Sequence, residues 1–117
     1  MNEVQRMELK TLCSQASWQN RVEDWAKDRN LIDGSTPGHQ LKKLIEEVGE
    51  LASAIALGDL AGIKDGIGDT AVVLTIIARQ IDSSLSECQE LAWDEIKDRK
   101  GRLIDGKFVK EADLPKE

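Results

Sequence analysis

The segment from Asp59 to Ile81 constrains the fold most strongly, because its apolar residues fall on every side of a helix. Within it, the run from Ala71 to Ala78 contains a single polar side chain, Thr75. A helix that is apolar all round is too hydrophobic to face water and must be covered by other parts of the protein. We therefore expect this segment to be the central helix of the domain or to lie in a subunit interface.

The rest of the chain also has helical periodicity. Apolar residues recur at spacings of three and four, only 3% of residues are aromatic, and tyrosine is absent, which favours helices over strands. We expect four helices, at about 12–29, 36–57, 59–81 and 84–99. Residues that cap or stop helices flank the last three: Thr36 before Pro37, Gly58, Asp59, and Ser84 with Glu87.

After the fourth helix, Asp105 and Gly106 stand between two short apolar stretches. This is a hairpin turn signal, although the stretch could equally be an ordered tail packed on a neighbouring subunit. The 117 residues suffice for one core, so we expect a single domain over residues 1–117. The predicted fold class is all-α, a four-helix bundle with a short C-terminal hairpin or extended tail.

Charge and composition exclude several classes of function. A net charge of -6 argues against general binding to nucleic acid or to an anionic membrane, because both need a basic surface. The apolar runs are far shorter than a membrane span, and the first residues lack an apolar signal core, so we expect a cytoplasmic protein. Cys13 and Cys88 are expected to be free thiols there.

Acidic residues cluster on two of the predicted helices. Glu46 and Glu50 point the same way and Glu47 stands about a quarter-turn off, at about 100° per residue. Asp65 and Asp69 repeat the i, i+4 spacing at the start of the apolar segment. Packed face to face, the two helices would place four or five carboxylates around one cavity, which suits Mg²⁺ or Mn²⁺ rather than Zn²⁺.

The alternative for the three glutamates is a solvated helix face supported by Lys42 and Lys43. Their apolar surroundings favour a site instead, since carboxylates that border a core need a cation or a donor. Asp69 strengthens this interpretation, because it lies within the most apolar helix. The neighbouring Gly66 and Gly68 indicate close helix approach, room for a ligand or a local helix irregularity.

These motifs resemble the MazG-type nucleotide pyrophosphohydrolases of the all-α NTP pyrophosphatase superfamily. The resemblance rests on Glu-Glu-x-x-Glu at 46–50 and on Gly68-Asp69. The flanking segments at 25–29 and 93–101 are similar to those of short, single-domain members, including phage-borne ones. It implies hydrolysis of a nucleoside or deoxynucleoside triphosphate to the monophosphate and pyrophosphate, with Mg²⁺ as cofactor.

The resemblance also implies roles for the acids. Glu46, Glu50 and Asp69 would ligate the metal, and Glu47 would be a ligand or the base for the attacking water. The family pattern has Glu three residues before the aspartate, where this chain has Gly66. Asp65 would then replace the missing ligand, or the site would hold fewer metals.

Basic and polar residues nearby are candidates for substrate contacts. Lys43 is the first candidate for the phosphates; Lys97, Arg99 and Lys100 are the next, or else they form a basic last turn that complements the helix dipole. Asp94 stands where the family has a nucleotide-contacting polar residue. Three further residues could reach the base or sugar, or could be ordinary surface and core residues: Gln40, Trp18 and Trp25.

Two functions compete at this point. The first is a Mg²⁺-dependent nucleotide pyrophosphohydrolase that works as a homodimer or as a dimer of dimers, a homotetramer. The second is a catalytically weak helical module that binds a nucleotide or a partner protein, and Gly66 is its main support. Release of pyrophosphate with added Mg²⁺ separates the two.

Overall fold

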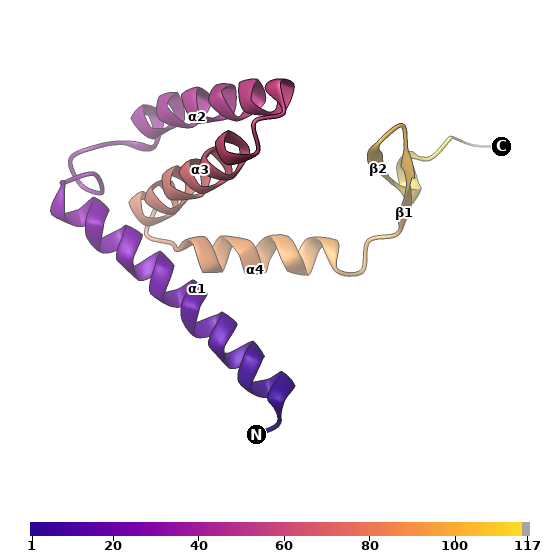
Figure 1. Ribbon diagram of the computed structural model, residues 1–117, viewed down its shortest axis with the longest axis horizontal. Coiled ribbons are helices and arrows are strands. Elements are labelled where there is room, and N and C mark those ends of the chain that lie inside the picture. The colour runs from indigo at the N-terminus through magenta and orange to yellow at the C-terminus, as the bar shows by residue number, and fades with distance from the viewer. Residues whose placement is uncertain (116–117) are drawn as a thin grey trace. The chain divides into compact units, whose positions relative to one another are not determined.

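A computed structural model describes residues 1–115 of the chain. Four helices are followed by a two-stranded hairpin and a short 3₁₀ turn, as predicted for the fold class (Figure 1). The chain forms two compact units, from Met1 to Leu85 and from Ser86 onward, and each is described by itself. The elements are α1 (Glu3–Asp28), α2 (Pro37–Leu57), α3 (Leu60–Gln80), α4 (Leu85–Ile96), β1 (Gly101–Ile104), β2 (Lys107–Lys110) and η1 (Glu111–Asp113).

Helix α1 begins earlier than predicted. The expected start near residue 12 is wrong, because Asn2 and Gln5 form a capping box well upstream of it. The Gln5 amide donates to Asn2 Oδ1 at 2.7 Å, and the Asn2 amide donates to Gln5 Oε1 at 3.0 Å. These bonds satisfy amides that a helix start otherwise leaves unpaired. Residues 3–17 of α1 are exposed, and its buried residues lie nearer its C-terminal end.

Helices α2 and α3 form an antiparallel hairpin (Figure 1). Thr36 caps α2 as predicted, since its hydroxyl accepts a hydrogen bond from the His39 amide at 3.1 Å. Gly58 ends α2 in the left-handed conformation, with φ of 66°, which glycine adopts without a steric penalty. Asp59 then caps α3 by accepting from the Gly62 amide at 3.1 Å. The turn between the helices is therefore determined locally.

The core of this unit lies where α3 packs on α2 and α1. A Cβ built on Gly66 would lie 3.1 Å from Leu51 Cβ, and one on Gly62 would lie 3.1 Å from Ala54 Cβ. Close helix approach, one of the three predicted reasons for Gly66, is thus confirmed. The buried residues of the core are small or β-branched: Ala26, Ala54, Val73, Thr75, Ile76 and Ala78.

Helix α3 is central but not covered on every side within residues 1–85. Ile67 is 58% exposed and Leu74 is 40% exposed. The expectation of a helix too apolar to face water is therefore met on one side only. No helix among the described residues is long and apolar enough to cross a bilayer.

In the second unit, α4 ends at Ile96, before the predicted Arg99, because the chain turns at that point. The strands pair antiparallel, with Gly101 opposite Lys110 and Ile104 opposite Lys107. Asp105 and Gly106 both have positive φ, 49° and 81°, as a two-residue type I′ turn requires. The hairpin predicted from these two residues is confirmed.

Candidate metal centre

Three carboxylates from α2 and α3 meet on one side of the helical hairpin. One oxygen each of Glu47, Glu50 and Asp69 lies within 4.8 Å of the other two. Glu47 and Glu50 come from adjacent turns of α2, and Asp69 comes from α3, which the contact at Gly66 holds close to α2. The geometry depends on that close contact, because Asp69 lies one turn after Gly66.

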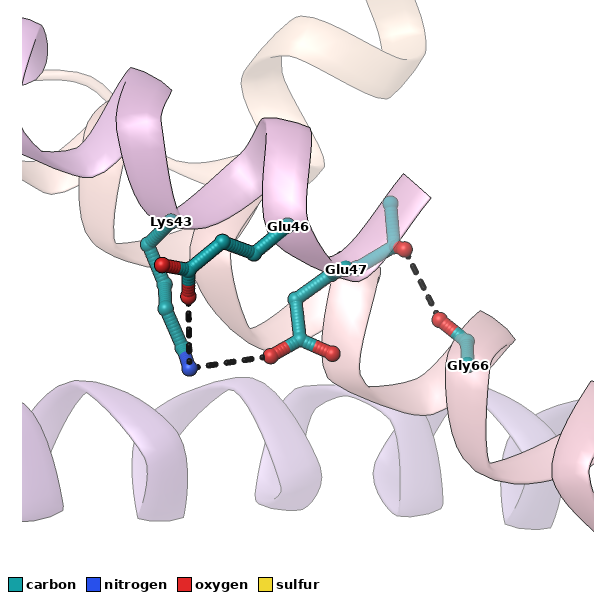
Figure 2. A network of polar contacts seen from close by, with 5 residues as sticks. Lys43, Glu46, Glu47 and Gly66 are labelled. Atoms are coloured by element: carbon teal, nitrogen blue, oxygen red, sulfur yellow. Dashed lines mark hydrogen bonds and ion pairs between the residues drawn. The ribbon is translucent and has the colours of Figure 1, made fainter. Parts of the chain in front are cut away.

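Glu47 is the buried member of the cluster, with only 5% of the residue exposed. Figure 2 shows the Lys43 ammonium between two carboxylates, 3.2 Å from Glu47 Oε1 and 3.4 Å from Glu46 Oε2. The second Glu47 oxygen, Oε2, is buried and accepts no hydrogen bond from any of residues 1–115. An anionic oxygen that is buried without a donor is costly unless a cation balances it.

Burial and like charge raise the pKa values of two carboxyl groups in the cluster. The pKa of Glu50 is raised, first by the charge of Glu47 and then by partial burial, with Lys43 opposing the shift. The pKa of Asp69 is raised as well, chiefly by burial and then by the charges of Asp65 and Glu47. The pKa of Lys43 is raised by its bonds to Glu47 and Glu46. The positive charge of Lys43 thus balances the negative charge of the cluster only in part.

These residues fit a hard divalent cation. Mg²⁺ and Mn²⁺ prefer carboxylate oxygens, and the cluster offers three of them together with one unpartnered buried oxygen. Binding of such an ion would offset the repulsion from Glu47 that is the main cause of the raised pKa of Glu50, and the burial and like charges that raise the pKa of Asp69. The arrangement can therefore hold a metal, and a triphosphate is a natural further ligand for that metal.

The other acids expected at the metal lie differently. Glu46 pairs with Lys43, its side chain is 66% exposed, and it is outside the group of three. Asp65 lies close enough to Asp69 to raise its pKa by charge and by hydrogen bonding. At Gly66 the contact with Leu51 leaves little room for a side chain, which gives a structural reason for glycine at that position.

A cleft of about 420 Å³ adjoins the cluster between α1 and α3. Asp69 is part of its lining, so the cleft reaches the carboxylate cluster directly. Trp25 is 45% exposed there, and the Arg29 guanidinium lies 4.4 Å from the centroid of a Trp25 ring. The remaining lining residues come from α1 and α3: Trp18, Arg21, Val22 and Val72.

The predicted polar contact residues occupy two places. Gln40 donates a hydrogen bond to Ser35 Oγ at 3.1 Å, which ties α2 to the preceding loop. The others belong to the second unit, where Lys97 pairs with Asp94 at 3.2 Å and Arg99 pairs with Glu95 at 3.2 Å. The carbonyl of Lys100 accepts from the Glu111 amide at 2.9 Å.

Sequence reasoning did not single out Arg21 as a cleft residue. It lies three residues after Trp18 and four before Trp25, so the three share one face of α1. That spacing was the available signal, but a tryptophan stripe at helical spacing is also typical of a core. The packing of α1 on α3 distinguishes a cleft lining from a core stripe, because it leaves this face of α1 along the cleft.

The chain was compared with known proteins. The model of the MazG nucleotide pyrophosphohydrolase domain matches residues 35–103, which hold α2, α3, α4 and most of β1. An uncharacterized 18.2 kDa protein in the rep-hol intergenic region of Haemophilus phage HP1 (strain HP1c1) is 52% identical over 68 residues. That match covers 56% of this chain and 42% of the phage protein, less than half of its length. No solved structure matches the chain.

The family match includes every acidic residue of the cluster and extends over more than half of the chain. It agrees with the fold and with the hard-ligand chemistry of Glu47, Glu50 and Asp69. The chain therefore belongs to the MazG nucleotide pyrophosphohydrolase family.

Proposed function

We propose that this protein is a Mg²⁺-dependent pyrophosphohydrolase that converts an NTP or dNTP to the monophosphate and pyrophosphate. The observation that carries the proposal is the group of three carboxylates with one buried, unpartnered oxygen on Glu47. Membership of the MazG family supports the choice of a nucleoside triphosphate as substrate.

Glu47, Glu50 and Asp69 hold the metal in this proposal, with Asp65 as a further acid beside Asp69. Mn²⁺ can take the place of Mg²⁺ because both accept carboxylate oxygens. Glu46 remains a predicted ligand from the family resemblance, and its ion pair with Lys43 would have to open for that role. When bound, Mg²⁺ neutralises phosphate charge and acidifies water.

The chain's own residues supply the proton chemistry. Glu47 is a metal ligand or the base for the attacking water. Lys43 holds its Oε1 at 3.2 Å, so Oε2 would either bind the metal or accept the proton of the water. In the second case, which the following step describes, Glu50 and Asp69 hold the metal. The water oxygen forms a bond to the α-phosphorus, and the bond from that phosphorus to the bridging oxygen breaks. Pyrophosphate leaves with the electron pair, and the water's proton goes to Glu47.

The cleft beside Asp69 is the proposed place for the nucleoside. Trp18 and Trp25 offer aromatic faces for a base, and Arg21 offers a guanidinium for its polar edge or for phosphate. Lys43 lies beside Glu47 and is the first candidate for phosphate contact within residues 1–85. Gln40 in the first unit, and four residues of the second unit, stay predicted substrate contacts from the sequence: Asp94, Lys97, Arg99 and Lys100.

We place the enzyme in the cytoplasm as a homodimer or homotetramer. The exposed apolar residues of α3, Ile67 and Leu74, support self-association. With a net charge of -6, neither nucleic acid nor an anionic membrane is a proposed partner.

The experiment is pyrophosphate release from a panel of NTPs and dNTPs, each with Mg²⁺, with Mn²⁺ and with EDTA. Release that needs metal and that is lost in Glu47→Gln supports the proposal. Glu8→Gln, an exposed glutamate on α1, is the matched control and should retain activity. No release from any nucleotide by a folded protein would favour the binding module, in which case the nucleotide would only raise the melting temperature.

A further inference from the structure

Within residues 1–115, Lys43 is the one cation that forms an ion pair with a member of the carboxylate cluster. Its ammonium lies 3.2 Å from Glu47 Oε1 and 3.4 Å from Glu46 Oε2, and all three residues come from α2 (Figure 2). Glu50 and Asp69 form no ion pair with the described residues. A metal ion that binds the cluster therefore arrives beside a positive charge that is already held there.

The two ion pairs of Lys43 lie in different surroundings. The Glu47 side chain is 7% exposed, so water and salt screen its charge little. The Glu46 side chain is 66% exposed, and its pair with Lys43 is a weak surface pair. The Lys43 side chain is itself 54% exposed. Glu47 thus holds Lys43 more strongly than Glu46 does, yet a ligand in solution can still reach the ammonium.

We propose that Lys43 opposes metal binding to the empty cluster and makes the metal and the triphosphate bind cooperatively. In the empty site its charge is the counter-ion of Glu47, and it repels a divalent cation that approaches Glu50 and Asp69. The ammonium has three N–H donors on a flexible stem, so it can also pair with a phosphate oxygen, whose negative charge offsets the repulsion. Each ligand then raises the affinity for the other by the same factor.

This inference rests on the proposed function, because it takes the triphosphate as the second ligand. It adds a means of regulation at the same site. Free metal alone occupies the cluster weakly, and the site retains a metal ion when a triphosphate is present to occupy Lys43. The site is therefore loaded with metal mainly when substrate is bound.

The direction of the effect separates this role from a structural one. Lys43 and Glu47 are four residues apart on α2, a spacing at which an ion pair can simply support the helix. If Lys43 only held Glu47 in place, removal of the lysine would leave Glu47 less ordered and would weaken metal binding. If its charge opposes the metal, removal of the lysine tightens metal binding even though the protein loses an ion pair.

The first test measures the Kd of Mn²⁺ without nucleotide, from the electron paramagnetic resonance signal of the free ion. Lys43→Met removes the charge and keeps the length of the side chain, so its Kd should be about fivefold or more below that of the wild type. Lys42→Met is the matched control, because Lys42 is exposed and forms no ion pair within residues 1–115. Its Kd should stay within about twofold of the wild type. An unchanged or raised Kd in Lys43→Met would overturn the proposal.

Two further variants keep this test decisive. Lys43→Arg retains the charge and should retain the wild-type Kd, and an arginine variant that binds Mn²⁺ as tightly as Lys43→Met would show that charge is not the cause. Circular dichroism establishes that each variant is folded. Should Lys43→Met not fold, Lys43→Gln removes the charge but keeps an N–H donor near Glu47, and the same fall in Kd is expected of it.

The second test measures the coupling with inorganic tripolyphosphate, which presents a triphosphate without a base or sugar. In the wild type and in Lys42→Met, Mn²⁺ and tripolyphosphate together should raise the melting temperature by more than the sum of their separate effects. Lys43→Met should lose this excess at the same concentrations. No excess in the wild type, or an excess that Lys43→Met retains, would overturn the coupling. Neither test depends on turnover, so a protein that shows the coupling but releases no pyrophosphate would refute the hydrolase and support this inference.

Discussion

Replacement of Glu47 by glutamine tests the metal centre with the smallest change of shape. The side chain keeps its length and can still accept from Lys43 through its amide oxygen, at the place where Glu47 Oε1 now lies 3.2 Å away. It loses one of the three negative charges that lie within 4.8 Å of each other. The apo protein should remain folded, because the change removes the charge that is the main cause of the raised pKa of Glu50 and that adds, after burial and Asp65, to the raised pKa of Asp69.

The expected loss of metal-induced stability follows from the linkage between metal binding and unfolding. At a Mg²⁺ concentration a hundredfold above Kd, the metal adds about 2.7 kcal/mol to the free energy of unfolding. A tenfold loss of affinity reduces this gain to about 1.4 kcal/mol. For a domain of this size, the metal-induced rise in melting temperature should fall from roughly 10 °C to roughly 5 °C. Loss of the proton acceptor should lower kcat by about 10²–10⁴-fold.

The assay pairs thermal unfolding, with and without Mg²⁺, with pyrophosphate release at saturating nucleotide. Glu8→Gln should match the wild type in both measurements. Wild-type turnover together with a full metal-induced shift in Glu47→Gln would refute the role of Glu47. A normal metal shift with lost turnover would instead make Glu47 the base and leave metal binding to Glu50 and Asp69.

Three further predictions use other parts of the site. In EDTA, the melting temperature should rise as the pH is lowered from 7 toward 5. The reason is that Glu50 and Asp69 have raised pKa values, so they bind protons more tightly in the folded protein than in the unfolded chain. A melting temperature that stays constant or falls would show that the pKa values of these acids are ordinary or lowered. Gly66→Glu restores the family's acid but must displace Leu51, so it should destabilise the protein by about 1–3 kcal/mol in urea unfolding, and an unchanged midpoint would contradict the close contact. Trp18→Ala should raise KM with little change in kcat, and an unchanged KM would exclude base contact in the cleft.

The α2–α3 hairpin could be predicted from sequence because its determinants are local. Thr36, Gly58 and Asp59 each act on residues within one turn, so their roles follow from the order of the residues alone. The same holds for Asp105 and Gly106 in the hairpin. The early start of α1 is also encoded locally, by the capping box of Asn2 and Gln5, although the residues that follow it up to 17 are exposed.

The arrangement of the site residues depends on how the helices pack, which the spacing of residues along the sequence does not define. Glu46 and Glu47 are neighbours in the motif and both pair with Lys43, yet Glu47 is buried while the Glu46 side chain is 66% exposed. The role of Gly66 needed the distance to Leu51. The cleft beside Asp69 exists only because α1 packs on α3, a contact between segments far apart in the chain.

The most direct test of the central claim is the fate of water oxygen during turnover. A nucleoside triphosphate is hydrolysed by the wild-type protein with Mg²⁺ in ¹⁸O-labelled water, and the ¹⁸O content of each product is measured by mass spectrometry. Attack at the α-phosphorus predicts one ¹⁸O in the nucleoside monophosphate and none in pyrophosphate. Label in pyrophosphate or orthophosphate, or no product from any nucleotide, would contradict the proposed reaction.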